Sequence, residues 1–122
     1  MTMKRLIMCG TLGLIAAAAN AQTPDGQQAF NNSCRTCHTV KEGDNRQGPT
    51  LHGVVGRKAG TVEGYAFSSS MAQAGVTWDE ATLDKFIEAP DQLVSGNAMK
   101  PYGGIPDPAQ RKAIIDYLKQ AK

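Results

Sequence analysis

The chain has 122 residues, of which 20% are charged, and its formal net charge is +2 because 13 lysines and arginines face 11 aspartates and glutamates. This length suits one domain, since domains usually contain roughly 100–200 residues. The composition excludes a coiled coil, a collagen-like fibre, a disordered charged tail and a polytopic membrane protein. No cluster of lysines and arginines is present, so we expect no binding of nucleic acid.

The N-terminus has the pattern of a secretory signal peptide. Lys4 and Arg5 form a short positive region, residues 6–19 are an uncharged apolar run, and a small-x-small cleavage site ends at Ala21. The run is shorter than the ~20 residues that span a bilayer as a helix. We therefore expect residues 1–21 to be removed and no stable membrane anchor to remain. The domain that is left, residues 22–122, has a formal net charge of zero.

The first element of this domain is predicted to be a helix. Residues 23–25 read Thr-Pro-Asp, which supplies an N-cap, a proline at the first helical position and a negative charge near the positive end of the helix. Gly26, Phe30 and Cys34 follow at four-residue spacing and share one face.

Residues 34–38 read Cys-Arg-Thr-Cys-His, the pattern of c-type haem attachment. The two cysteines can form thioethers with the two vinyl groups of a porphyrin, and the histidine can then ligate the iron. A structural zinc site needs four Cys or His ligands, usually from two paired motifs. After cleavage of the signal peptide, His52 is the only Cys or His outside the motif at 34–38, so a second pair is missing. A thioredoxin-like dithiol needs a βαβ context, and a disulfide hairpin has no need of the histidine. The sequence therefore predicts one haem c on Cys34 and Cys37, with His38 as an iron ligand.

Three neutral side chains are candidates for the opposite face of the iron. Met71 lies in a predicted short helix, where a core methionine is the commoner role. His52 lies 14 residues after His38, so we expect it to make a backbone hydrogen bond on the same side. Met99 lies in a loop rich in glycine and proline, 61 residues after His38, which is far enough to reach the other face. We expect Met99 to be the sixth ligand.

The rest of the domain is predicted to be helices and loops without a convincing strand. The glycine-rich stretch 43–64 favours a long ordered loop, which inside a compact domain is uncommon unless it has a function such as wrapping a haem edge. Residues 65–74 favour a short helix closed by Gly75.

Two further helices have clear start signals. Residues 77–80 match a capping box and predict a helix that ends at Pro90, whereas Asp107 opens the last helix. The apolar faces of these two helices are formed by Leu83, Phe86 and Ile87 in the first and by Ile114, Ile115, Tyr117 and Leu118 in the second.

With these motifs, the chain resembles a class I cytochrome c of the bacterial kind close to mitochondrial cytochrome c. The likeness covers nearly all of residues 26–121. It is carried by the attachment motif 34–40, Gly-Pro-x-Leu-His-Gly at 48–53, Gly-Arg-Lys-x-Gly at 56–60, Gly-x-Thr-Trp at 75–78, Pro90, Gly-x-x-Met at 96–99 and Ile-x-x-Tyr-Leu at 114–118. The resemblance implies an all-α, single-domain fold of about four to five short helices and long loops around one haem.

The resemblance also implies roles for individual residues. His38 and Met99 would be the axial ligands, and the Pro49 carbonyl would accept a hydrogen bond from the other ring nitrogen of His38. Arg57 and Trp78 would be partners of the haem propionates. Four residues would pack together where the first and last helices cross: Gly26, Phe30, Ile114 and Tyr117.

Some positions depart from the mitochondrial pattern. Phe67 and Phe86 stand where tyrosines are usual, and Asn97 belongs to an Asn-Ala pair that replaces the usual Thr-Lys before the ligand methionine. An extra residue after Met99 leaves open whether Pro101 or Tyr102 covers the haem edge.

The implied function is single-electron transfer rather than catalysis, because two protein ligands leave no open position on the iron. The expected partners are redox proteins such as quinol–cytochrome c oxidoreductase, a terminal oxidase, a photosynthetic reaction centre or a periplasmic dehydrogenase, docked briefly on an interface below about 1,200 Å². A periplasmic monomer is expected. The alternatives are an open-coordination haem enzyme or gas sensor, and an electron-transfer subunit of a dehydrogenase complex.

Overall fold

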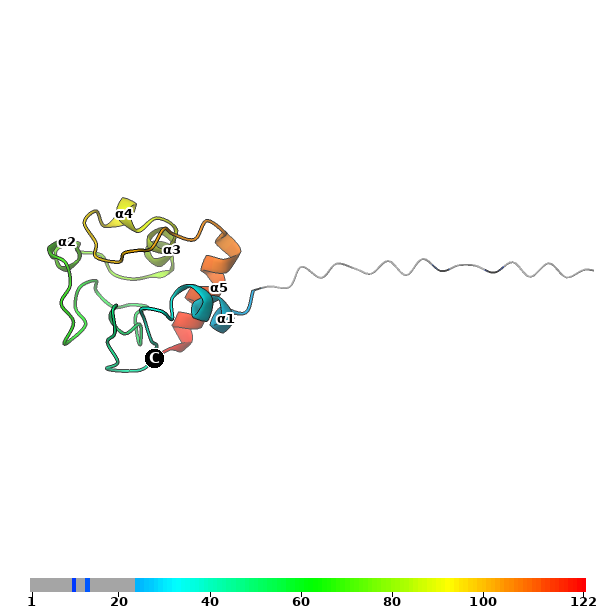
Figure 1. Cartoon of the computed structure of the whole chain (residues 1–122), viewed down its shortest axis with the longest axis horizontal. Helices are drawn as coiled ribbons and strands as arrows, with labels where there is room; N and C mark the ends of the chain where they lie inside the picture. The colour runs from blue at the N-terminus through cyan, green and yellow to red at the C-terminus, as the bar shows by residue number, and fades with distance from the viewer. Residues whose placement is uncertain (1–9, 11–12, 14–23) are drawn as a thin grey trace, which may run out of the picture.

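A computed structural model describes Gly10, Gly13 and residues 24–122, so the predicted signal peptide lies almost wholly outside the described residues. The described part is helical, and its only pairing of extended backbone is one antiparallel bridge between Lys58 and Thr77. The all-α fold with short helices and long loops is confirmed. The helices in chain order are α1 (Gly26–Ser33), α2 (Ser69–Ala72), α3 (Glu80–Glu88), α4 (Pro90–Leu93) and α5 (Pro108–Gln120) (Figure 1).

Helix α1 begins later than predicted. Asp25, not Thr23, is the N-cap: its backbone is extended and its carboxylate accepts a hydrogen bond from the Gln28 backbone N–H at 3.1 Å. Asp is at least as good a cap as Thr. The helix therefore starts at Gly26, and Thr23 itself lies outside the described residues.

Helix α2 is shorter than predicted. Only Ser69–Ala72 is helical, and the Ser68 hydroxyl caps it by accepting from the Met71 backbone N–H at 3.1 Å. The residues before it make tertiary contacts instead. The Tyr65 hydroxyl donates to the Gln47 carbonyl at 2.6 Å, and its ring lies edge-on to Phe67 with centroids 4.8 Å apart.

The capping box of α3 exists but lies two residues later than predicted. The Asp79 carboxylate accepts from the Thr82 backbone N–H, and the Thr82 hydroxyl accepts from the Asp79 backbone N–H, both at 2.8 Å. Thr77 belongs to the bridge with Lys58 and is not available as a cap. Helix α3 ends at Glu88, before Pro90 as expected, and Pro90 then begins α4 at its first position.

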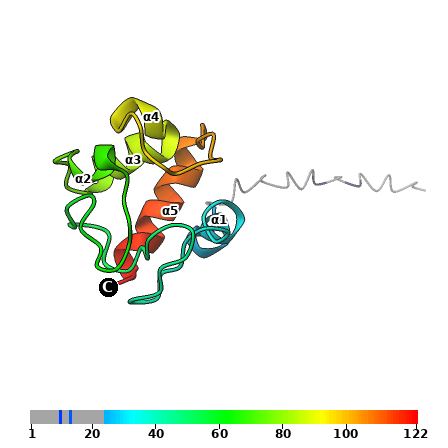
Figure 2. The ribbon, with the colours of Figure 1, turned by 60° about the vertical axis from the view of Figure 1, so that its left-hand side comes forward.

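Helix α5 packs against both α1 and α3 (Figure 2). At the α1 crossing, the Phe30 and Tyr117 rings have centroids 5.3 Å apart. Gly26 permits this approach, since a Cβ there would contact the Ala113 carbonyl oxygen and lie 2.9 Å from the Tyr117 Cβ. The predicted apolar faces of α3 and α5 pack inward, with Tyr117 partly buried against the core and the other six side chains buried: Leu83, Phe86, Ile87, Ile114, Ile115 and Leu118.

Arg111 joins α5 to the chain before it and to α3. Its side chain is buried, and it donates to the Asp84 carboxylate at 2.7 Å and to the carbonyls of Ile105 and Pro106 at 3.0 and 2.9 Å. A buried charge is tolerated when it is paired and hydrogen-bonded. These contacts hold the segment between α4 and α5 against the helical core. Within the described residues, no helix combines the length and the apolar character needed to cross a membrane.

Candidate haem-binding site

The attachment motif forms a tight turn at the end of α1. Cys34 is the C-cap, with its backbone N–H bonded to the Phe30 carbonyl at 2.7 Å, and the N–H groups of Cys37 and His38 both bond to the Cys34 carbonyl. Cys34 and Cys37 form no disulfide with each other. Burial, with a smaller effect from Cys37, raises the pKa of the Cys34 thiol to about 11. The turn therefore places two half-buried thiols and an imidazole within five consecutive residues.

The His38 ring is oriented from across the glycine-rich loop. Its Nδ1 lies 2.8 Å from the Pro49 carbonyl oxygen. A carbonyl can only accept, so Nδ1 carries the proton and Nε2 keeps its lone pair. Burial lowers the pKa of His38, while the bond to Pro49 opposes that shift. The ring is therefore neutral, as a metal ligand must be.

The loop that carries Pro49 is attached to the motif by backbone hydrogen bonds. The Gly48 N–H donates to the Cys37 carbonyl and the Leu51 N–H donates to the Thr39 carbonyl, both at 2.8 Å. The Cys37 sulfur also lies 3.3 Å from the Gln47 side-chain oxygen. These contacts between residues 37–39 and 47–51 hold the Pro49 carbonyl at a fixed distance from the His38 ring.

Arg57 and Trp78 are adjacent in the structure, since the backbone N–H of Trp78 donates to the Arg57 carbonyl at 2.8 Å. The Arg57 guanidinium donates to the carbonyls of His52 and Thr50 at 2.9 and 3.1 Å. Among the described residues no carboxylate pairs with it, and burial lowers its pKa without an opposing charge. A half-buried cation in this state suits an anionic group such as a propionate.

The three candidates for the opposite face of the iron lie at different places. The His52 Nδ1 donates to the Val40 carbonyl at 3.2 Å, which is a backbone bond of the expected kind. Met71 lies on α2, partly buried against the hydrophobic core. Met99 is also partly buried against the core, in the loop between α4 and α5.

Tyr102 joins the segment after Met99 to α3. The Tyr102 hydroxyl donates to the Ile87 carbonyl at 2.5 Å. Burial, together with the nearby Cys34 thiol, raises the pKa of Tyr102 to about 12. Pro101 is exposed, so Tyr102 is the residue after Met99 that packs inward.

The chemistry of these residues fits a covalent haem. They offer two thiols, one neutral imidazole and one half-buried guanidinium. Within the described residues, no group of three or more His, Cys, Asp or Glu side chains could hold a bare metal ion. Several apolar side chains pack on the core while remaining partly exposed, among them Val40, Leu51, Val55, Met71 and Met99.

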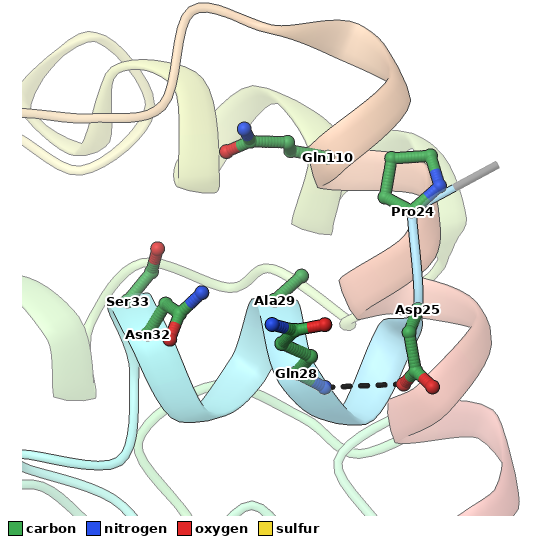
Figure 3. A pocket seen from close by; sticks show the side chains of 7 residues that line it. All are labelled: Pro24, Asp25, Gln28, Ala29, Asn32, Ser33 and Gln110. Carbon is green, nitrogen blue, oxygen red and sulfur yellow. Dashed lines mark hydrogen bonds between the residues drawn. The ribbon is translucent and has the colours of Figure 1, made fainter. Parts of the chain in front are cut away.

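Two surface pockets are lined by other residues. One of about 140 Å³ lies between α1 and the start of α5 and is lined mainly by polar side chains, such as Asp25, Gln28 and Gln110 (Figure 3). The second, of about 530 Å³, also lies between α1 and α5. Neither contains a residue of the attachment motif or Met99, so neither belongs to the haem site.

The family of the chain is settled by comparison with known proteins. The family model for cytochrome c matches residues 24–122. The chain belongs to the cytochrome c family. It is 46% identical over 89 residues to cytochrome c2 iso-2 of Magnetospirillum molischianum, which covers 73% of this chain and 91% of that protein. It is 42% identical over 98 residues to cytochrome c2 of Rhodopila globiformis, covering 80% and 92% of the two chains.

A solved structure agrees with this assignment. Cytochrome cH from Methylobacterium extorquens superposes with a TM-score of 0.73 at 42% identity, over 80% of this chain and 99% of that one. This family carries haem c on a C-x-x-C-H motif. This cytochrome c therefore carries one haem c, bound covalently through Cys34 and Cys37.

Some residues of the site were not singled out from the sequence. Gly48 was noted only as part of a motif, and neither Gln47 nor the side-chain contacts of Asn97 were anticipated. Gly48 next to Pro49 is a usable indication of close approach. Asn97 lies two positions before the predicted ligand Met99, in a loop without periodicity, and a polar residue at such a place indicates a side chain that organises the loop.

Proposed function

We propose that this cytochrome c is a mono-haem electron carrier whose iron is held between His38 and Met99. When bound, the haem supplies a one-electron couple at its iron. The protein residues hold the cofactor, set its potential and keep other molecules from the metal. The observation that carries the proposal is the 2.8 Å contact between the His38 Nδ1 and the Pro49 carbonyl.

This contact supports ligation by His38 in two ways. It fixes the tautomer that leaves Nε2 free to bind iron, and a hydrogen bond from the opposite nitrogen makes the ligand more basic. Gly48 supports it further, since a Cβ at that position would lie 2.6 Å from Nδ1 and 2.8 Å from Nε2 of the same ring. The ring is thus held between the backbone of its own turn and that of the following loop.

Met99 is proposed for the opposite side. Its side chain packs partly buried against the hydrophobic core, and its thioether is a neutral ligand that favours ferrous iron and raises the potential. If His38 and Met99 both ligate the iron, a small substrate would find no free position on the metal. We therefore propose electron transfer, not catalysis, as the activity.

Arg57 and Trp78 are proposed to hold the haem propionates. The guanidinium of Arg57 has no carboxylate partner among the described residues, and its backbone is paired with that of the buried Trp78. Holding two negative groups beside a half-buried cation orients the haem and offsets their charge.

We also propose that the protein is exported to the periplasm, with cleavage after Ala21, and works as a monomer. There it would exchange electrons with partners such as quinol–cytochrome c oxidoreductase, a terminal oxidase, a photosynthetic reaction centre or a periplasmic dehydrogenase. The two relatives named cytochrome c2 support a bacterial setting of this kind. Mass spectrometry of protein from a periplasmic extract should give a chain that begins at Gln22 and carries one haem.

The optical spectrum of the ferric holoprotein tests the ligand pair. Sulfur ligation gives a weak far-red charge-transfer band, which should be present in the wild type and absent in Met99→Ala. Met71→Leu is the matched control, because it removes the other partly buried methionine and should leave the band unchanged. If the wild type has no band, or if Met71→Leu abolishes it, Met99 is not the ligand. Ready binding of carbon monoxide by the ferrous wild type would favour an open-coordination haem protein.

A further inference from the structure

The loop between α4 and Met99 is organised around one buried amide. Asn97 is only 3% exposed, whereas the residues on either side of it, Gly96 and Ala98, are more accessible. Its side chain makes three hydrogen bonds. The Nδ2 group donates to the Asp91 carboxylate at 2.8 Å and to the Val94 carbonyl at 2.9 Å, and Oδ1 accepts from the Met99 backbone N–H at 3.0 Å.

These bonds use the two ends of the amide differently. The two acceptors, Asp91 and Val94, face the nitrogen, and the single donor, the Met99 N–H, faces the oxygen. The opposite orientation would point oxygen at oxygen and nitrogen at nitrogen, so only one orientation satisfies the group. A buried amide is costly unless its partners are present. The Asn97 amide therefore links the backbone of Met99 to α4, and it can do so in only one orientation.

Two further contacts of this loop do not involve Met99. The Val94 N–H bonds to the Pro90 carbonyl at 2.9 Å, which anchors the start of the loop to α4. The chain then runs toward α2, where a Cβ on Gly96 would lie 2.6 Å from the Ser70 hydroxyl (Figure 1). The Asn97 side chain spans the segment from Asp91 to Met99 and so limits how far the Met99 backbone can move away.

We propose that Asn97 is a positioning residue that holds Met99 in place as an iron ligand, through the bridge Asp91–Asn97–Met99. The inference rests on the proposed ligation by Met99. It adds to that ligation the contact that keeps Met99 from leaving the iron. Lys100 also contacts Asp91, at 2.9 Å, but both side chains are more than half exposed, at 56% and 65%. An exposed pair contributes little, so the buried amide and not this ion pair holds the loop.

Displacement of Met99 by imidazole in the ferric holoprotein measures how firmly the loop holds this ligand. An added ligand binds only when Met99 leaves the iron, so its apparent affinity reports how easily the loop opens. Asn97→Ala should raise the affinity for imidazole by about tenfold, the factor that corresponds to the loss of one buried hydrogen bond. Asn97→Asp should raise it further, because it places a second carboxylate against Asp91.

Two controls separate positioning from general stability. Lys100→Ala removes the other partner of Asp91, and Ile115→Val weakens the core on α5 without touching the loop contacts. Both should leave the affinity for imidazole within about twofold of the wild type, even where guanidinium unfolding shows a loss of stability. The double variant Asp91→Asn/Asn97→Asp exchanges donor and acceptor and should return part of the way toward the wild type.

The outcomes distinguish this inference from the proposed function. If the wild type lacks the far-red band, ligation by Met99 fails and the role of Asn97 fails with it. If the band is present but Asn97→Ala binds imidazole like the wild type, or Ile115→Val gives an equal increase, ligation stands and the positioning role is wrong. Should Asn97→Ala not yield holoprotein, Asn97→Asp and its double variant make the same comparison.

Discussion

The imidazole of His38 lies directly against the backbone of Gly48. A Cβ at this position would be 2.6 Å from Nδ1 and 2.8 Å from Nε2, closer than real Cβ contacts come. The backbone of Gly48 is not in the left-handed region, so glycine is needed here for space and not for conformation. The position of the ligand ring is thus set by the absence of a side chain ten residues later in the chain.

We expect Gly48→Ala to move the His38 ring and break its bond to Pro49. Overpacking of this kind costs about 1–3 kcal/mol, and the strain falls on the iron ligand itself. Holoprotein yield should fall strongly, and the remaining protein should show altered ligation in its absorption and magnetic circular dichroism spectra. Gly103→Ala is the matched control, since a Cβ there has no neighbour within 4 Å. Normal spectra and yield for Gly48→Ala would contradict this account.

The crossing of α1 and α5 depends on Gly26. The substitution Gly26→Ala adds a Cβ that contacts the Ala113 carbonyl and lies 2.9 Å from the Tyr117 Cβ. Alanine itself favours a helix, so any loss of stability comes from the crossing. We expect the free energy of unfolding to fall by about 1–3 kcal/mol in guanidinium denaturation. The exposed neighbour gives a control, Gln27→Ala, and equal stability of the two variants would show that the helices can separate at no cost.

Removal of the charge on Arg57 should change the haem potential. A positive charge nearby stabilises the ferrous state, which carries one positive charge fewer than the ferric state. Arg57→Gln keeps a donor for the nearby carbonyls but removes the charge, so the potential should fall by tens of millivolts, on the order of what a partly screened charge contributes. Electrochemical titration measures it. The exposed Arg46, which is paired with Asp44, provides the control Arg46→Gln, and a potential that is unchanged or higher in Arg57→Gln would refute the assignment.

The N-cap of α3 should make stability depend on pH. Hydrogen bonds from the Thr82 backbone and side chain hold the pKa of Asp79 below its ordinary value of 3.8. Because the folded pKa is the lower one, the stabilisation is fully present above the ordinary pKa and is lost as the pH falls through the folded pKa.

Thermal melts of Asp79→Ala and the wild type check this sign. The midpoint of the variant should lie a few degrees lower at pH 7, and the gap should narrow as the pH falls below about 4. Glu42→Ala, at an exposed acidic residue outside the helices, should show a smaller gap at pH 7. A gap that stays constant with pH would mean that the cap works without its charge.

The helix boundaries show where sequence patterns stop being sufficient. Residues 23–25 contain two acceptable caps, Thr23 and Asp25. Pro24 favours a helix that starts after Thr23, whereas Asp is the stronger cap residue. Thr77 and Asp79 are also two acceptable caps, and the bridge between Thr77 and Lys58 removes one candidate. The side of each helix that is buried is predicted more reliably than the residue at which the helix starts. The apolar face that contains Ile114 follows from the spacing of apolar residues alone.

The sequence by itself determined the attachment of the haem, because the chemistry of residues 34–38 lies within five consecutive positions and needs no distant partner. It also determined the helical class, since the apolar spacing of the longer helices is local. The contact between Pro49 and His38, which the family resemblance implies, is present in the structure. Only the tertiary structure decided that Tyr102 and not Pro101 packs inward, and that Asn97 joins Asp91 to the Met99 backbone. Each of these depends on hydrogen bonds made by residues of loops without periodicity, and the partners of such bonds do not follow from the spacing of residues.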